Sequence, residues 1–250
     1  MKHVYAGLVT LLALGAAQIG AQDQLVRVPL AYKAPGEGPA PNFSPRGTQV
    51  QLTPAPADMK LPSGSVQPAK TGIIKIGTDR SAWIAVLATA SIEHPRDLCR
   101  LYLDRNRNGK FDDDGAALTA VPIQNEKTKA WWTSIRQVEL SIPYGGAPEP
   151  YLVNFWIVRD GEAVPELLRY SVGSWRAGTV TIDGVPALVA AMDGDNNAVF
   201  DKADSWSVLE ASAPDAAKLV LSHTEARGTG DEPKVHALAT AVGDLAKAPR

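Results

Sequence analysis

The chain has 250 residues, of which 45% are hydrophobic and 21% are charged, and these are the values of a globular protein long enough to bury a core. Its formal net charge of −2 and pI near 6.1 give it no general attraction to nucleic acid, so we expect no nucleic-acid partner. Cys99 is the only cysteine, which excludes an intramolecular disulfide, and its apolar neighbours predict a buried, unreactive thiol.

The first 21 residues have the layout of a secretory signal peptide. Lys2 and His3 precede an apolar run that is closed by small residues, and this run is shorter than a confident membrane span. We place cleavage after Ala21, with Ala17 as the alternative. The sequence therefore predicts a secreted or periplasmic protein that has no membrane span once the signal is removed.

Residues 22–70 form a proline-rich stretch, which we interpret as an arm: either a linker or a chain that wraps over the folded body. Eight prolines fall between Lys33 and Lys70, and this density is incompatible with a continuous helix or sheet. Two pieces of the arm, 25–32 and 48–52, have the composition of short edge strands.

The interval 71–210 is predicted to be a β domain. Apolar or alternating runs predict strands at 73–76, 83–90, 98–103, 132–142, 151–158, 164–172, 175–182, 185–192 and 206–209. The dipeptide Asp183-Gly184 between two apolar runs is a strong indication of a hairpin. Strands of this length, separated by turns, favour a mainly β fold, either an antiparallel sandwich or an open barrel.

Two parts of the chain have less regular patterns. Within 132–142, residues 132, 134, 136, 138 and 140 are assigned to one face of the strand, with Ile135 and Ile142 marking shifts of the alternation. Residues 211–250 are a weakly patterned tail, in which 218–222 could form a strand and 233–247 a short amphipathic helix.

Two acidic segments, 104–115 and 193–204, share one template. Each has oxygen-bearing side chains at loop positions 1, 3, 5 and 9, and a phenylalanine at position 8. Alternate side chains of a tightly curled segment can converge on one ion, and calcium binds through such oxygens. The pattern therefore predicts two calcium sites, and turn formation without a metal is the alternative.

In the first loop, the predicted ligands are five side chains and the backbone carbonyl at position 7: Asp104, Asn106, Asn108, the Lys110 carbonyl, Asp112 and Asp114. Gly109 occupies position 6, where a left-handed backbone is needed. Position 12 is Gly115, so the usual bidentate acid is missing, and Asp113 or Asp114 would have to replace it. The basic residues Arg105, Arg107 and Lys110 lower the negative charge of this loop and should weaken binding.

The second loop has the complementary defect. Its predicted ligands are Asp193, Asp195, Asn197, the Val199 carbonyl, Asp201 and Asp204. Position 6 is Ala198, for which a left-handed backbone costs about 1 kcal/mol. A slightly different turn would avoid this cost.

Both loops resemble the Asp-x-Asp-x-Asp-Gly calcium loops of EF-hands, dockerin modules and related exported bacterial proteins. The flanking sequence departs from helix-loop-helix: Pro95 and an alternating run precede the first loop, and the Asp183-Gly184 hairpin precedes the second. We therefore expect calcium to stabilise hairpin ends, with no switch-like opening. Asp104 and Asp193 are 89 residues apart, so a duplication of 71–118 and 175–210 is a further hypothesis.

Other chemistry is not indicated. No zinc spacing, hydrolase elbow or nucleotide-binding loop is present in the sequence, so catalysis is left open and its absence is favoured. We expect an exported calcium-binding β protein that serves as a binding or interaction module for a protein or carbohydrate partner. The alternative is a calcium-stabilised secreted hydrolase or carbohydrate-binding protein, in which Trp131 or Trp132, facing opposite ways, could contact a sugar ring.

Overall fold

The computed structural model of the chain describes residues 8–11, 26–38, 40–41, 47–143, 148–161, 164–182, 185–200, 204–210 and 218–219. These residues form strands and turns, with one 3-10 turn, η1 (Arg80–Ala82), and no α-helix. The three larger sheets are antiparallel and none closes into a barrel, so the predicted mainly β class is confirmed. No helix in the described ranges is long and apolar enough to span a membrane.

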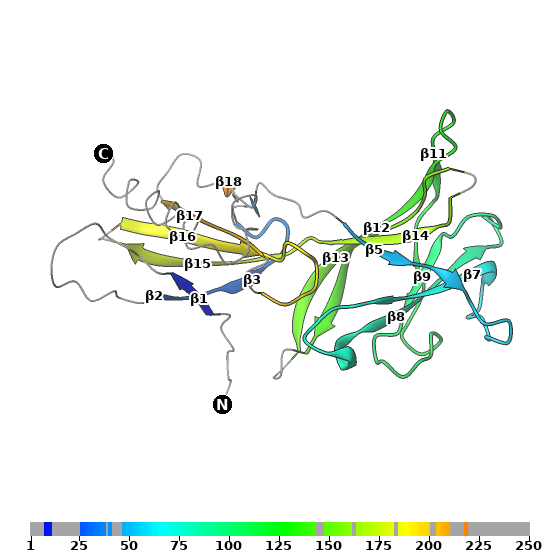
Figure 1. Cartoon of the computed structure of the whole chain (residues 1–250), viewed down its shortest axis with the longest axis horizontal. Helices are drawn as coiled ribbons and strands as arrows, with labels where there is room; N and C mark the ends of the chain where they lie inside the picture. Colours follow the sequence, from blue (N-terminus) through cyan, green and yellow to red (C-terminus); the bar gives the residue numbers. More distant parts are fainter. Residues whose placement is uncertain are drawn as a thin grey trace. The chain divides into compact units, whose positions relative to one another are not determined.

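The chain divides into two compact units (Figure 1). Unit 1 comprises Met1–Pro45, Ser174–Asp195 and Phe200–Arg250, and unit 2 comprises Arg46–Gly173 and Asn196–Val199. The first acidic loop lies wholly in unit 2, whereas the second acidic loop contributes residues to both.

The first sheet of unit 2 has the strand order β10-β9-β8-β7-β6. Its strands are β6 (Thr53–Pro54), β7 (Ser65–Ile74), β8 (Ile84–Ser91), β9 (Arg100–Leu103) and β10 (Leu118–Thr119). On one side of this sheet, Leu87 and Tyr102 form a buried apolar cluster with Ala69, and Met59 and Leu61 of the proline-rich stretch pack against it. This part of the predicted arm therefore wraps over the sheet.

Strand β7 begins at Ser65, although the sequence predicts a strand only from residue 73. The sequence does not predict a strand over residues 65–72 because Pro68, which has no N–H to donate to a sheet, normally argues against one. The register between β7 and β8 shifts between Val66 and Ala69, and a bulge of this kind tolerates a proline.

The second sheet of unit 2 has the order β11-β12-β13-β14-β5. Its strands are β5 (Thr48–Gln51), β11 (Ile123–Gln124), β12 (Trp131–Ile142), β13 (Glu149–Arg159) and β14 (Leu167–Val172). Strand β5 lies at the edge of this sheet and pairs with β14, as predicted for residues 48–52. The β14 strand is shorter than the predicted 164–172.

The alternation predicted for 132–142 holds up to Ile135, where the predicted shift occurs, but Val138 lies on the other face from Trp132 and no shift occurs at Ile142. The register with β13 shifts between Ile135 and Val138, so Arg136 and Gln137 together oppose one residue of the partner strand. Because the bulge inserts a residue, Trp132 lies on the opposite face from Val138, which is 5% exposed. Adjacent Trp131 and Trp132 do face opposite ways: Trp131 is 2% exposed, whereas Trp132 is half-buried.

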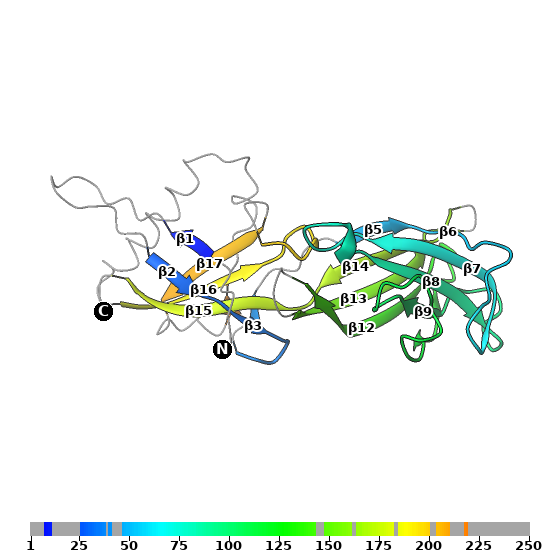
Figure 2. The ribbon, with the colours of Figure 1, turned by 90° about the horizontal axis from the view of Figure 1, so that it is seen from below.

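The two sheets of unit 2 form two layers with buried side chains on both (Figure 2). Thr133 Oγ1 donates to the Leu98 carbonyl at 3.0 Å. Lys70 of β7 pairs with Glu166, which precedes β14, and Arg159 Nη1 lies 3.9 Å from the same carboxylate. Burial would raise the pKa of Glu166, but the hydrogen bond from Lys70 and the two positive charges outweigh it and lower the pKa.

Unit 1 contains a four-stranded sheet with the order β17-β16-β15-β3. Its strands are β3 (Ala31–Lys33), β15 (Trp175–Ile182), β16 (Val185–Met192) and β17 (Ser205–Glu210). The predicted hairpin on either side of Asp183-Gly184 is confirmed, because β15 and β16 pair in register from Arg176↔Ala191 to Ile182↔Val185.

Short strands complete unit 1. Strand β1 (Leu8–Leu11) pairs antiparallel with β2 (Val26–Pro29), and β4 (Ala40–Pro41) pairs parallel with β18 (Lys218–Leu219). The buried residues Val28, Leu30, Ala187, Val189 and Ala191 form the core cluster of the unit. The helix predicted at 233–247 and most of the tail lie outside the described residues.

Candidate metal centre

Both acidic loops connect neighbouring antiparallel strands. Loop 1 (residues 104–115) lies between β9 and β10, and loop 2 (residues 193–204) lies between β16 and β17. Loop 1 follows the middle strand of β10-β9-β8, and loop 2 follows the middle strand of β17-β16-β15. The strand order around the two loops is therefore the same. The predicted strand flanks are confirmed, and the duplication remains a hypothesis with a matching local topology.

The backbone has the same unusual conformation in both loops. Position 4 is left-handed, with a φ of 62° at Arg107 and 62° at Asn196. Position 6 is also left-handed, with a φ of 81° at Gly109 and 61° at Ala198. The second loop therefore does not avoid the strain at Ala198 by a different turn, and the two loops share left-handed backbones at positions 4 and 6.

Side-chain oxygens hold this curl in place. Asp104 accepts hydrogen bonds from the backbone N–H groups of Asn108 at 3.0 Å and Gly109 at 2.9 Å. The side chain at position 5 accepts from the N–H at position 7 in both loops, from Lys110 at 2.8 Å in loop 1 and from Val199 at 2.6 Å in loop 2. In loop 1, these contacts leave further lone pairs on the Asp104 and Asn108 oxygens for an ion.

The phenylalanine at position 8 fixes each loop to its sheet. Phe111 packs against the apolar cluster that contains Leu87 and Tyr102. Phe200 packs against the core cluster of unit 1, and the guanidinium of Arg176 lies 5.1 Å from the centre of its ring. The loops are thus held by apolar packing as well as by hydrogen bonds.

Three carboxylates of loop 2 converge. One oxygen from each of Asp193, Asp195 and Asp204 lies within 4.8 Å of the others, and these are the predicted ligands at positions 1, 3 and 12. Asp193 is 0% exposed and Asp204 is 5% exposed, whereas Asp195 is exposed. The N–H of Gly194 donates to Asp204 at 2.8 Å.

Ionised carboxylates this close to one another repel. At an effective dielectric constant of about 20, two unit charges separated by 4.8 Å repel by about 3.5 kcal/mol, and solvent lowers this for pairs that include Asp195. A divalent cation bound between the carboxylates attracts each of them, so the net electrostatic interaction of each carboxylate becomes favourable. The donor set contains only oxygen, which suits hard cations such as calcium and does not suit zinc.

Loop 1 does not form an equivalent cluster. Within the described side chains, the triplet in loop 2 is the one group of three His, Cys, Asp or Glu residues with this spacing. In loop 1, Asp113 accepts from the Asn108 side chain at 2.6 Å and Asp114 accepts from the Asn106 N–H at 3.0 Å, while Asp112 is exposed. With Gly115 at position 12, the acid that completes the cluster in loop 2 has no counterpart here, and calcium at loop 1 stays a prediction.

The remaining predicted ligands of loop 2 are not tested by this geometry. Asn197 and Val199 belong to unit 2, and Asp201 lies outside the described residues. The number of ligands beyond the three carboxylates therefore stays a prediction.

Two sets of loop residues have roles that the sequence pattern does not predict. Asn196, which is 0% exposed, accepts from the Val172 N–H at 2.7 Å and donates to Thr48 Oγ1 at 3.1 Å. The sequence signal for this role is the asparagine itself, because asparagine adopts a left-handed backbone more readily than most residues. Arg105 and Arg107 donate to the carbonyls of Glu139 and Ser141, at 2.8 and 3.3 Å, and so link loop 1 to β12.

No family model matches the chain, and neither a curated protein nor a solved structure is significantly similar to it. The fold and the acidic cluster therefore define the class of protein: a mainly β protein with a candidate metal-binding loop.

Proposed function

We propose that this is an exported calcium-binding β protein in which calcium is structural, and that it acts as a binding or interaction module. The observation that carries the proposal is the convergence of Asp193, Asp195 and Asp204, two of them buried. Calcium prefers oxygen ligands, carboxylates among them, and the cluster supplies three carboxylates. Export is inferred from the signal-like pattern of residues 1–21.

A structural role is supported by how loop 2 is attached. The loop joins β16 to β17, and Phe200 anchors it in the core cluster of unit 1. Calcium sensors work by changing the angle between two helices, and the described residues contain no α-helix beside the loop. An ion at this position would hold the ends of two strands together.

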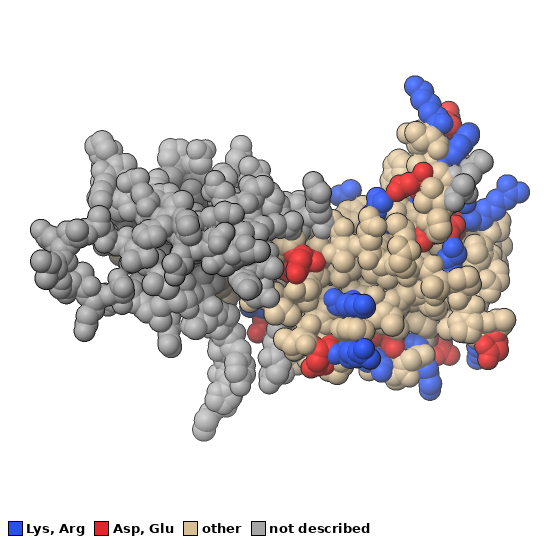
Figure 3. Space-filling model, in the orientation of Figure 1, with Lys and Arg blue, Asp and Glu red and all other residues tan. Residues whose placement is uncertain are grey.

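The partner is proposed to be a protein or a carbohydrate. On the face shown in Figure 3, acidic and basic side chains of the described residues are interspersed, with no field of one sign. Such a surface suits partners recognised by shape and hydrogen bonding more than polyanions recognised by charge.

One observation favours the alternative of a calcium-stabilised carbohydrate-binding protein. Trp156 lies directly opposite Ser134 on the neighbouring strand, and Trp132 is two residues before Ser134, so the two half-buried indoles share one face of the sheet. Aromatic rings on a sheet face can pack against sugar rings. A hydrolase has no comparable support.

Thermal unfolding with and without calcium tests the proposal. A dissociation constant of about 10⁻⁴ to 10⁻³ M, as in extracellular sites, gives about 1.4 to 2.7 kcal/mol of stabilisation at about 10 mM free calcium. For a chain of this length, that raises the melting temperature by about 3 to 10 °C. We expect Asp193→Ala to remove most of this response.

The control is Glu126→Ala, which removes an exposed acid in the turn before β12 and should leave the calcium response intact. A melting temperature that is the same in chelator and in millimolar calcium would reject the proposal.

A further inference from the structure

The outer edge of β12, on the side away from β13, has little strand cover. Within the described residues, β11 pairs with this side only at Trp131 and Trp132, which leaves residues 133–142 without a neighbouring strand there. This uncovered stretch is longer than any edge strand of the three larger sheets. An uncovered edge presents a row of backbone N–H and C=O groups with which another chain can pair.

The backbone groups of Glu139 and Ser141 point outward at this edge. Leu152, which lies opposite Glu139 on β13, accepts at its carbonyl from the Gly173 N–H at 2.8 Å, on the side away from β12. Pro150, opposite Ser141, has no N–H to donate to β12. Both are therefore non-hydrogen-bonded pairs of the antiparallel ladder, in which the N–H and C=O groups of Glu139 and Ser141 face away from β13.

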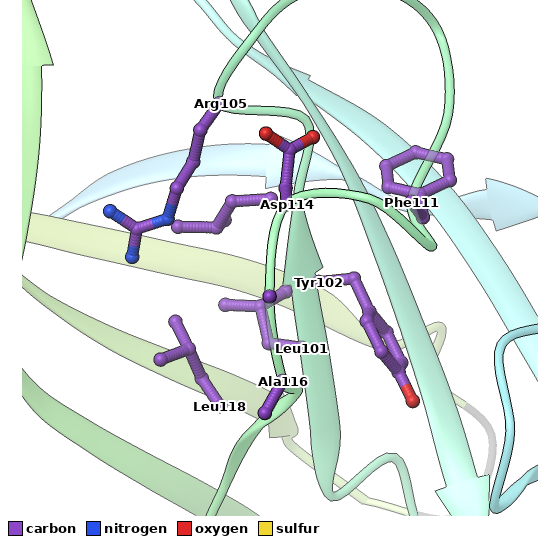
Figure 4. Close-up of a pocket in the computed structure, with 9 residues that line it drawn as sticks. Leu101, Tyr102, Arg105, Phe111, Asp114, Ala116 and Leu118 are labelled. Carbon is purple, nitrogen blue, oxygen red and sulfur yellow. The ribbon is translucent and has the colours of Figure 1, made fainter.

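Two arginines of loop 1 cover these outward carbonyls. Arg105 Nη1 donates to the Glu139 carbonyl at 2.8 Å, and Arg107 Nη2 donates to the Ser141 carbonyl at 3.3 Å. Donors and acceptors are both two residues apart, so the two side chains match the repeat of the strand edge. Figure 4 shows the Arg105 side chain extending away from loop 1, on the side opposite to Phe111.

Arg107 is held more firmly than Arg105. Its Nη1 donates to the Arg105 carbonyl at 3.0 Å, and its Nη2 also donates to the Ala82 carbonyl at 3.3 Å. Arg105 is exposed, and among the described residues its side chain donates to the Glu139 carbonyl alone. Removing the Arg105 side chain therefore uncovers the edge with little loss of packing.

The edge also has open space beside it. A groove of about 470 Å³ lies between β10 and residues 134–139 of β12, and Arg105 is part of its lining. Consecutive residues of β12 line the groove, although their side chains alternate between the two faces of the sheet. The groove therefore runs along the backbone edge of the strand.

We propose that the outer edge of β12 is an association surface for a second copy of this chain, and that Arg105 and Arg107 keep it closed. Antiparallel pairing of two copies about Leu140 places Glu139 opposite Ser141 of the second copy, and these residues carry the outward-facing groups. This register also keeps the two Glu139 carboxylates from lying directly opposite each other. The proposal goes beyond the calcium function, whose supporting cluster is in loop 2.

The test is light scattering after size-exclusion chromatography of the full chain, in chelator so that loop 1 binds no calcium. Arg105→Ala/Arg107→Ala should have twice the mass of wild type at about 100 µM, because unpaired strand edges associate at micromolar to millimolar concentrations. The control Lys110→Ala/Lys127→Ala also removes two positive charges, from exposed residues that do not cover the edge, and should keep the wild-type mass.

Two further variants identify the edge and guard against misfolding. Ser141→Pro, added to the double arginine variant, removes an N–H that faces away from β13 and should restore the wild-type mass. Arg105→Ala alone removes one hydrogen bond of an exposed side chain, so it keeps the fold and should dimerise more weakly than the double variant. The proposal is overturned if neither arginine variant exceeds the wild-type mass, if the lysine control dimerises as well, or if Ser141→Pro does not reverse the dimerisation.

Discussion

Exchanging the residues at position 6 of the two loops gives a prediction with a clear physical origin. Gly109 and Ala198 have left-handed backbones, with φ of 81° and 61°. A left-handed conformation costs a residue with a Cβ atom about 1 to 2 kcal/mol, and glycine escapes this cost. We therefore compare Gly109→Ala with Ala198→Gly.

Gly109→Ala isolates the backbone term. A Cβ atom built at Gly109 has no heavy atom within 4 Å, so neither a clash nor new packing contributes. The strain of about 1 to 2 kcal/mol is offset by about 0.4 to 1 kcal/mol from the lower entropy of the unfolded chain. The net prediction is a destabilisation of about 1 kcal/mol.

Ala198→Gly should be nearly neutral. The change relieves a similar strain, but Ala198 is 0% exposed, so about 0.8 kcal/mol of methyl burial is lost. The higher entropy of the unfolded glycine chain costs a further amount of about 0.4 to 1 kcal/mol. The terms cancel to within about 1 kcal/mol.

Denaturant unfolding of the full chain in chelator measures both effects without a contribution from calcium. If Gly109→Ala leaves the unfolding free energy unchanged or raises it, the left-handed strain has been assigned wrongly. An Ala198→Gly variant stabilised by clearly more than 1 kcal/mol would show that the buried methyl group contributes nothing.

Two further changes test the packing and the electrostatics of the fold. Gly178→Ala should destabilise unit 1 by about 1 to 3 kcal/mol in thermal unfolding, because the new Cβ would collide with the Pro29 carbonyl oxygen, and an unchanged melting temperature would contradict this. Glu166 has a lowered pKa, so its stabilising contribution is present above the ordinary glutamate pKa and is lost as the pH falls through the folded-state value. We expect Glu166→Gln to destabilise the protein at pH 7, where Lys70 loses its partner, and to reduce the loss of stability between about pH 5 and pH 3, measured by denaturant unfolding. The same loss of stability with pH in wild type and variant would refute the assignment.

The strands that could be predicted are those whose pattern is local. The hairpin at Asp183-Gly184 follows from a turn dipeptide between two apolar runs, and its strands match the structure at both ends. The curl of the acidic loops follows from the same kind of local rule, because the alternation of oxygen-bearing residues specifies which N–H groups they accept from.

The features that could not be predicted depend on the partner strand. The bulge at Arg136 and Gln137 reverses which residues of β12 face inward, and it exists only in register with β13. The β7 strand contains Pro68, which reads as a break until the shift of its register with β8 is known. The alternation marks a shift at Ile135 but does not indicate which residues form the bulge, and it does not indicate the shift between Val66 and Ala69.

The candidate metal site could be predicted only in part, because its geometry also depends on how two strands pair. Position 12 lies eleven residues after position 1, and the return of Asp204 to Asp193 depends on how β17 pairs with β16. In loop 1 the sequence offers Asp113 and Asp114 as substitutes, but the described side chains of that loop do not form a group of three acids with the spacing found in loop 2. The sequence predicts a site in each loop, the first weakened by its basic residues, and the geometry favours the second.

The most direct test of the account is an isothermal calorimetric titration of chelator-stripped protein with calcium. Wild type should bind with a dissociation constant of about 10⁻⁴ to 10⁻³ M. The near-isosteric variants Asp193→Asn and Asp204→Asn, which keep the shape of the loop and remove one charge each, should bind at least about tenfold more weakly. No binding by wild type up to about 10 mM calcium, or equal binding by both variants, would contradict the assignment of calcium to loop 2.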